Sequence, residues 1–180
     1  YSLLNQVEIK QFGLSGDIPA AADYDGDGRA DPAVFRPATG QYFFLRSSDG
    51  GTTAVTLGAA GDIPIPCDYD GDGKADVALF RPIGAVWQFH YSSTGADAAE
   101  NFGASADIPV PGDYDGNGRC EAAVWRPADG SWYIAGAQPI QFGLGGDVPV
   151  PADYNGDGTT DLMVFRPGIG GWYLRQGGSA

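Results

Sequence analysis

One acidic loop occurs four times in this chain, beginning at Asp23, Asp68, Asp113 and Asp153. The first two copies read Asp-Tyr-Asp-Gly-Asp-Gly-x-x-Asp, and successive copies start 45, 45 and 40 residues apart. A period of this size is typical of propellers and related arrays, in which one repeat cannot bury its own apolar face and depends on its neighbours. We therefore expect a single domain built from four repeats.

The loop has the donor spacing of a metal site. Oxygen-bearing side chains stand at positions 1, 3, 5 and 9, and a glycine stands at position 6. A hard cation such as Ca²⁺ needs oxygen ligands at such intervals when one short loop wraps around it. An EF-hand is excluded because position 12 counted from Asp23 is Val34 rather than a bidentate glutamate, and because the proline-rich flanks would break its helices. The sequence therefore predicts about four Ca²⁺ sites.

The net charge of −13 comes mostly from the repeat motif. Of the 23 acidic residues, 18 lie at the loop ligand positions or in a Gly-Asp pair that precedes each loop and is Ala106-Asp107 in the third repeat. Four Ca²⁺ ions would bring the formal charge to about −5. We expect no binding to nucleic acid from so acidic a chain. We also expect no membrane insertion, because no apolar stretch approaches the roughly 20 residues that span a bilayer.

The repeat unit predicts an all-β fold. The 29 glycines and 13 prolines punctuate the chain, and no window has sustained helical periodicity. Strand patterns occur before the loop, as at 108–111, directly after it, as at 76–81, and in an aromatic segment such as 42–45. A fourth, less regular strand ends at Leu57-Gly58 or its equivalents. Four short antiparallel strands per unit form a propeller blade, so we predict a β-propeller or propeller-like array of four repeats. The expected boundaries are 1–13 for terminal strands and 14–58, 59–103, 104–143 and 144–180 for the repeats.

Several short motifs recur together over nearly the whole chain. They are Phe-Gly, Gly-Asp-Ile-Pro-Val-Pro, Asp-x-Asp-x-Asp-Gly-x-x-Asp and Val-Phe-Arg-Pro. In this combination the chain resembles the FG-GAP or VCBS-type repeats, which occur in the calcium-binding propeller of integrin alpha subunits and in many secreted bacterial proteins. The resemblance implies an extracellular propeller in which Ca²⁺ stiffens the loops on one face while other loops contact partners.

The resemblance also implies a ligand set in which position 7 supplies only a backbone carbonyl. The implied ligands are Asp23, Asp25, Asp27, Arg29 and Asp31; Asp68, Asp70, Asp72, Lys74 and Asp76; Asp113, Asp115, Asn117, Arg119 and Glu121; and Asp153, Asn155, Asp157, Thr159 and Asp161. The third loop departs from the pattern at Asn117 and Glu121, and the fourth departs at Asn155. We expect weaker binding at these two sites because they carry less charge, although amide oxygens remain competent ligands.

The two ends of the chain are complementary. Tyr1–Leu4 and Val7–Gln11 have the pattern of a third and a fourth strand, whereas the last repeat has a third strand at 171–174 and no fourth behind it. Val7–Gln11 is therefore expected to complete the last blade, which leaves no long unpaired edge. Alternatively, the next molecule fills that place in a head-to-tail contact that can propagate. Tyr1 does not begin a secretory signal, so we expect a mature or trimmed form.

Recurring side chains predict internal contacts. Four arginines precede a proline at the same place in each repeat, and they match in number the four aspartates that precede the loops. We therefore expect each arginine to contact a carboxylate or a carbonyl within its own repeat or in a neighbouring one; the arginines are Arg36, Arg81, Arg126 and Arg166. Trp87, Trp132 and Trp172, and the loop tyrosines Tyr24, Tyr69, Tyr114 and Tyr154, are interpreted as packing residues, with sugar stacking by the tryptophans as the alternative. Cys67 and Cys120 are expected to form one disulfide between adjacent repeats, with two buried thiols as the alternative.

The sequence contains no enzymatic motif. His90 is the only histidine, and the chain has no nucleophile elbow, phosphate-cradling loop or dinucleotide fingerprint, so we expect no enzyme. The predicted function is a secreted or cell-surface calcium-binding module that binds or adheres to an extracellular protein or glycan through the variable segments 47–56 and 92–100. The alternative is a structural subunit that binds copies of itself and assembles into a filament or surface layer by terminal strand exchange.

Overall fold

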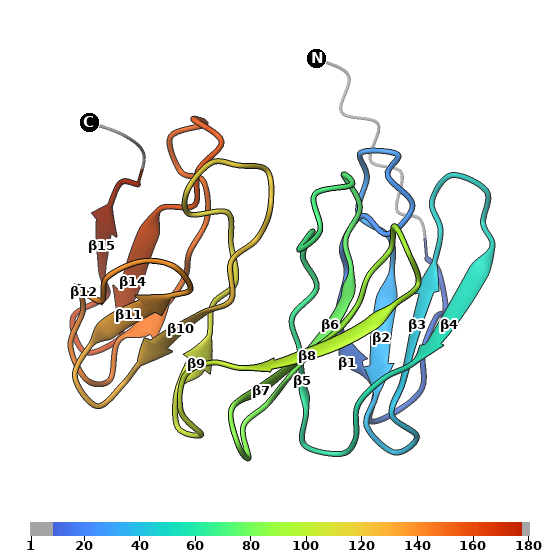
Figure 1. Ribbon diagram of the computed structural model, residues 1–180, viewed down its shortest axis with the longest axis horizontal. Helices are drawn as coiled ribbons and strands as arrows, with labels where there is room; N and C mark the ends of the chain where they lie inside the picture. The colour runs from blue at the N-terminus through green and yellow to red at the C-terminus, as the bar shows by residue number, and fades with distance from the viewer. Residues whose placement is uncertain (1–8, 178–180) are drawn as a thin grey trace.

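The structure is a computed structural model that describes residues 9–177 (Figure 1). These residues form small antiparallel sheets, one from each repeat, arranged as the four blades of a β-propeller. Blade 1 contains β1 (Ile18–Pro19), β2 (Ala33–Arg36), β3 (Gln41–Leu45) and β4 (Thr52–Thr56). Blade 2 contains β5 (Ile63–Pro64), β6 (Val77–Arg81), β7 (Val86–His90) and β8 (Asp97–Asn101). Blade 3 contains β9 (Ile108–Pro109), β10 (Ala123–Arg126), β11 (Ser131–Ile134) and β12 (Ile140–Gln141). Blade 4 contains β13 (Val148–Pro149), β14 (Leu162–Arg166) and β15 (Gly171–Arg175).

Within each blade the strands follow chain order, as expected for a meander. The second and third strands are joined by a tight turn that starts at the repeated Arg-Pro pair; in blade 1 the N–H of Gly40 donates to the carbonyl of Arg36 at 2.9 Å. Gly40 has φ 66°, and a Cβ there would collide with the carbonyl of Gly58. The glycine is therefore required both by the left-handed backbone and by the close approach of the chain that leaves the fourth strand.

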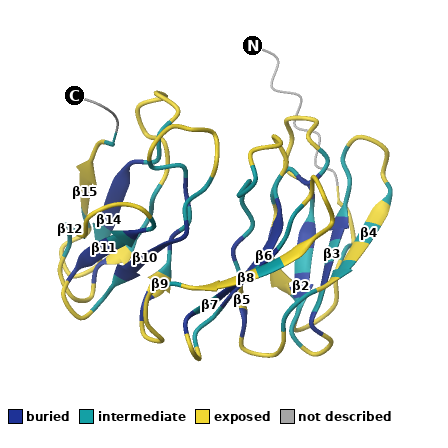
Figure 2. Cartoon of the chain, in the orientation of Figure 1, coloured by how far each residue is buried: buried dark blue, intermediate teal, exposed yellow. Residues whose placement is uncertain are grey.

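The hydrophobic core is divided between successive blades. The first cluster joins Phe35, Tyr42 and Phe44 of blade 1 to Val77 and Leu79 of blade 2. Equivalent clusters join blade 2 to blade 3 and blade 3 to blade 4. The second strands of the inner blades, β6 and β10, are consequently buried on both faces (Figure 2). β2 of blade 1 instead alternates between buried and half-buried residues, because only one of its faces meets a neighbour in the described structure.

The predicted contacts of the arginines are ion pairs within single repeats. Each arginine donates two hydrogen bonds of 2.8 to 2.9 Å to the Gly-Asp carboxylate nineteen residues earlier, giving Arg36–Asp17, Arg81–Asp62, Arg126–Asp107 and Arg166–Asp147. These pairs connect the segment before the first strand to the end of the second strand. The expectation of a repeated structural ion pair is thus confirmed.

Three expectations about the last blade need correction. Trp172 is expected to be a packing residue like Trp87 and Trp132, but it is 59% exposed whereas the other two are fully buried. Tyr154 is expected to pack like the other loop tyrosines, but it is 43% exposed. The predicted fourth strand of blade 4 is also not found: residues 9–11 form no strand, and Val7 and Glu8 lie outside the described residues, as does Tyr1–Leu4. Trp172 and Tyr154 are exposed because within residues 9–177 no hydrophobic cluster covers the far side of blade 4.

None of the helices in the described residues is long and apolar enough to cross a membrane.

Candidate metal sites

Each acidic loop connects the first strand of a blade to the second, and a backbone bridge closes it. The bridges pair Ala22 with Asp31, Cys67 with Asp76, Gly112 with Glu121 and Ala152 with Asp161. The residue at position 9 is therefore held directly beside the residue that precedes position 1. This closure brings the two ends of a nine-residue loop together, so its acidic side chains converge.

The aspartate at position 1 organises the inside of the loop. Oδ1 of Asp23 accepts a hydrogen bond from the N–H of Gly26 at 2.7 Å, and Oδ2 accepts one from Gly28 at 2.8 Å. Both glycines have left-handed φ values, 81° and 82°, which most other residues would adopt only with strain. The same pair of bonds recurs at Asp68, Asp113 and Asp153, so the spacing seen in the sequence reflects one backbone geometry repeated four times.

The carboxylate at position 9 is buried in the blade. Asp31, Asp76 and Asp161 have no solvent exposure. In the second loop, Oδ2 of Asp76 accepts the N–H of Tyr69 at 2.8 Å, and Oδ1 accepts the N–H of Ser92 at 2.7 Å. Asp31 and Asp161 have the same two kinds of partner. Position 9 therefore anchors the loop to the end of the third strand in addition to any role as a metal ligand.

Serine pairs after the third strand hold the acids at positions 3 and 5, a role not identified from the sequence. Ser47 Oγ donates to Asp27 at 2.8 Å, and Ser48 Oγ donates to Asp25 at 2.7 Å. Ser92 and Ser93 make the equivalent bonds to Asp72 and Asp70 in blade 2. The third loop has no serines at the equivalent positions, which hold Ala137 and Gln138. The recurring Ser-Ser pair is a visible signal, but it lies about twenty residues from the loop, within the segments expected to contact partners.

Three groups of acids come close enough to share one ion. In each group one carboxylate oxygen of each residue lies within 4.8 Å of the chosen oxygens of the others; the groups are Asp23, Asp25 and Asp27; Asp68, Asp70 and Asp76; and Asp113, Asp115 and Glu121. The predicted ligands of the first three loops are thus partly brought together. The described residues of the fourth loop form no such group, and there the side-chain amide of Asn155 donates to Asp157 at 2.9 Å.

The electrostatics of the second and third sites favour a cation. Burial raises the pKa of Asp76, and the nearby Asp70 raises it further, although hydrogen bonds from Ser92 and Tyr69 act in the opposite direction. Burial and the neighbouring Asp115 and Asp113 likewise raise the pKa of Glu121. Carboxylates are crowded here without a cationic side chain at hydrogen-bonding distance in the described structure. A divalent ion fits this donor set, because every side-chain donor in it is oxygen.

The residues at position 7 extend toward the preceding loop. The side chain of Lys74 lies against Gly26 of the first loop, where an added Cβ would be 3.1 Å from Cγ of Lys74. The side chain of Arg119 lies against Gly71 of the second loop, where an added Cβ would be 2.8 Å from Nε of Arg119. Thr159 approaches Gly116 in the same way. Arg29 begins the series, and no such contact with a preceding loop is found for it among the described residues. The candidate sites are thus stacked along the array, each covering part of the one before it.

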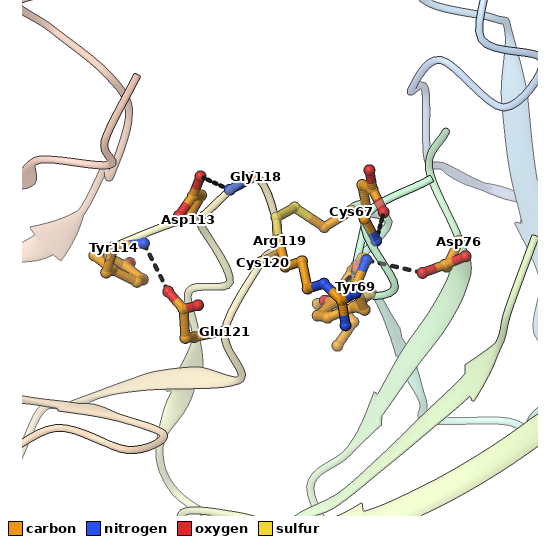
Figure 3. The surroundings of a disulfide bond; sticks show 12 residues. Cys67, Tyr69, Asp76, Asp113, Tyr114, Gly118, Arg119, Cys120 and Glu121 are labelled. Carbon is orange, nitrogen blue, oxygen red and sulfur yellow. Dashed lines mark hydrogen bonds between the residues drawn. A yellow bond between two sulfur atoms is a disulfide. The ribbon is translucent and has the colours of Figure 1, made fainter. Parts of the chain in front are cut away.

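A disulfide joins the second and third loops (Figure 3). Cys67 precedes position 1 of the second loop, Cys120 precedes position 9 of the third, and their Cα atoms are 6.1 Å apart. A backbone hydrogen bond from Cys120 N–H to the carbonyl of Asp68, 2.7 Å long, accompanies it. The expected disulfide between repeats is therefore confirmed, and it indicates an oxidising, extracellular-type environment.

No protein-family model matches the chain, and no curated protein was found to match it. The structure itself defines the class as a four-bladed β-propeller-like array with repeated acidic clusters.

Proposed function

We propose that this protein is an extracellular calcium-binding module of the FG-GAP or VCBS type, whose ions stiffen the loops while another surface binds a protein or glycan. The observation that carries the proposal is the convergence of three all-oxygen acidic clusters at equivalent places in successive blades. The proposal extends to the fourth loop, where an amide replaces the acid at position 3. It includes no catalytic activity.

Calcium is favoured over other ions by donor type and by coordination geometry. Ca²⁺ accepts six to eight oxygen ligands in flexible geometry, whereas Zn²⁺ prefers nitrogen and sulfur, and Mg²⁺ demands a near-ideal octahedron. The only histidine, His90, is bonded to Asp97 at 2.7 Å, and both cysteines form the disulfide. When bound, Ca²⁺ would supply the positive charge that the crowded carboxylates lack.

A groove between blades 1 and 2 is the proposed contact surface for the partner. It has a volume of about 400 Å³ and is lined by residues that include Tyr24, Phe44, Arg46, Lys74 and His90. Thr53, Val55 and Ser92, from the two variable segments, also line it. The basic groups of Arg46, Lys74 and His90 fit an acidic glycan or an acidic protein segment, and Asp25 in the lining connects the groove to the first metal site.

Calcium titration of chelator-treated protein tests the proposal. We expect heat of binding in calorimetry and a higher melting temperature in Ca²⁺ than in EDTA, since an ion that binds only the folded state stabilises it by mass action, about 2.7 kcal/mol at 100 times Kd. Asp70→Asn should remove one binding event. Glu100→Gln, which changes an exposed acid outside the loops, is the matched control and should leave the titration unchanged. If neither heat nor a thermal shift appears at millimolar Ca²⁺, the calcium proposal is wrong.

A further inference from the structure

Blade 4 has an outer face, formed by Phe165, Trp172 and Leu174, whose equivalents are buried in every other blade. Trp172 is 59% exposed, whereas Tyr42, Trp87 and Trp132 at the same position are fully buried. Leu174 is 42% exposed, and its equivalents Phe44, Phe89 and Ile134 are between 4% and 9% exposed. In blades 1 to 3 the next blade covers this face, so the difference lies in the neighbour and not in the residue types.

Blade 1 has the complementary face. In each later blade, two residues in or directly before the second strand pack into the preceding blade, as Val77 and Leu79 do against blade 1. Their equivalents in blade 1, Pro32 and Val34, are only half-buried. Blade 1 therefore presents the surface that would cover another blade, and within residues 9–177 the array has one uncovered apolar face at each end.

The N-terminal segment already has the position of a fourth strand. A Cβ built at Gly13 would lie 3.2 Å from Val34, and the equivalent Gly103 lies against Val124 in the same way. Gln11-Phe12-Gly13 repeats Gln141-Phe142-Gly143, in which Gln141 pairs with Ser131 of the third strand. Gly171 in β15 is the equivalent of Ser131, so in the same register Gln11 would pair with Gly171 if blade 1 packed against the outer face of a blade 4.

Backbone and indole donors follow the same pattern. The N–H of Thr160 donates a hydrogen bond of 2.6 Å to the carbonyl of Asp113 in the preceding loop. At the two ends of the array, the equivalent donor is the N–H of Ala30 and the equivalent acceptor is the carbonyl of Asp153. Neither makes such a bond within residues 9–177. Trp132 Nε1 donates to the carbonyl of Phe142 at 2.8 Å, and the equivalent acceptor for Trp172 would be the carbonyl of Phe12.

The two faces of one molecule do not meet each other. Figure 1 shows β15 at one end of the long axis and β2, β3 and β4 at the other. We propose that they meet between molecules: the outer face of blade 4 docks on Pro32 and Val34 of a second copy, whose residues 9–11 add the fourth strand to β15. This inference does not depend on calcium binding. Since the two faces differ, the contact is heterologous and can continue along a chain of copies.

The native disulfide supplies the probe. Cys67 and Cys120 link adjacent loops within the molecule, and the equivalent positions at the two ends of the array are Ala152 and Ala30. Because both native cysteines are bonded, Ala30→Cys and Ala152→Cys each introduce one free thiol. We expect an equimolar mixture of the two single variants to form a covalent dimer under mild oxidation, at least about tenfold faster than a control mixture of Ala38→Cys and Ala152→Cys. The control changes an exposed alanine in the turn after β2, at the opposite end of that strand from Ala30.

The double variant and a mass measurement complete the test. Ala30→Cys/Ala152→Cys should give a ladder of covalent oligomers on a non-reducing gel. The molar mass of the unmodified chain by light scattering should rise above 18.7 kDa with concentration. Trp172→Ala, which removes an exposed side chain, should abolish this rise while the far-UV circular dichroism spectrum stays unchanged. Crosslinking within single molecules, a dimer that forms no faster than the control, or a constant monomer mass would each overturn the proposal.

Discussion

Arg36 holds Asp17 by two parallel hydrogen bonds, Nε to Oδ1 and Nη2 to Oδ2, each 2.9 Å long. The guanidinium also lies over the ring of Phe43, 4.5 Å from its centroid. Oδ2 of Asp17 additionally accepts the N–H of Leu14 at 2.8 Å. One ion pair thereby connects the turn before the first strand, the second strand and the third strand of blade 1. Three further repeats have the same arginine–aspartate pair, so it is a structural element of the blade.

Replacement of Arg36 by lysine should destabilise blade 1. A lysine ammonium cannot donate two parallel hydrogen bonds to a carboxylate or stack a planar group on a ring. We expect Arg36→Lys to lower the free energy of unfolding measurably in urea denaturation. Arg46→Lys is the control because its pair with Asp49 is largely exposed, and it should change stability by less than about 0.5 kcal/mol. Equal effects of the two variants would contradict a special role for the buried pair.

The same ion pairs predict loss of stability in acid. The hydrogen bond from Arg36 holds the pKa of Asp17 below its usual value of 3.8, and Arg166 does the same for Asp147. Because the unfolded chain takes up these protons first as pH falls, the stabilisation is complete above about pH 4 and is lost as pH falls toward the lower folded pKa values. Melting curves between neutral and strongly acidic pH should show this decline. Asp17→Asn should flatten part of the decline below about pH 4, and an unchanged slope would argue against the linkage.

Asp76 and Glu121 should act in the opposite direction when calcium is removed. Burial and neighbouring acids raise the pKa of each, so the folded state takes up these protons more readily than the unfolded chain. In EDTA, mild acidification from neutral pH toward their unfolded values should therefore increase stability before the aspartate–arginine pairs begin to protonate. In saturating Ca²⁺ this increase should disappear. A stability profile with the same shape in both conditions would show that no ion occupies these sites.

The serine pairs should tune metal affinity. Ser48 lowers the pKa of Asp25 through its side-chain hydrogen bond and fixes the orientation of that carboxylate. Loss of such a supporting donor commonly weakens metal binding by about tenfold or more, so Ser48→Ala should weaken one calcium site to that extent in calorimetry. Ser15→Ala, in an exposed turn outside the loop, is the control. Unchanged affinity for Ser48→Ala would mean that Asp25 does not ligate the ion.

The disulfide should contribute substantially to stability. It links residues 53 positions apart and joins two blades whose loops also share a backbone hydrogen bond. Constraint of the unfolded chain by a loop of that length corresponds to about 4 kcal/mol as an upper value. Replacing both cysteines by alanine should therefore lower the free energy of unfolding by about 2–4 kcal/mol. A denaturation midpoint equal to that of the unmodified protein would contradict this expectation.

Local sequence patterns predict the features of this protein that depend on a few neighbouring residues. Asp23 and its equivalents, the glycines of the loop and the three regular strands of each blade are predictable because they depend on backbone geometry within a few residues. The link between Cys67 and Cys120 is also predictable, because similar repeats packed side by side bring equivalent edges together. The role of Ser48 is not, because its contact with Asp25 depends on how the third strand folds back across the loop.

Repetition in the sequence by itself determined the blade, its strands and the acidic loop, since each of these needs only short-range backbone preferences and alternating burial. Trp87, Trp132 and Trp172 occupy the same position of the repeat, so the sequence predicted the same buried environment for all three. Only the tertiary structure decided otherwise for Trp172, because burial depends on the presence of a next blade. The same physical reason leaves Val34 half-buried at the other end of the array: an apolar face is removed from water only where a neighbour covers it.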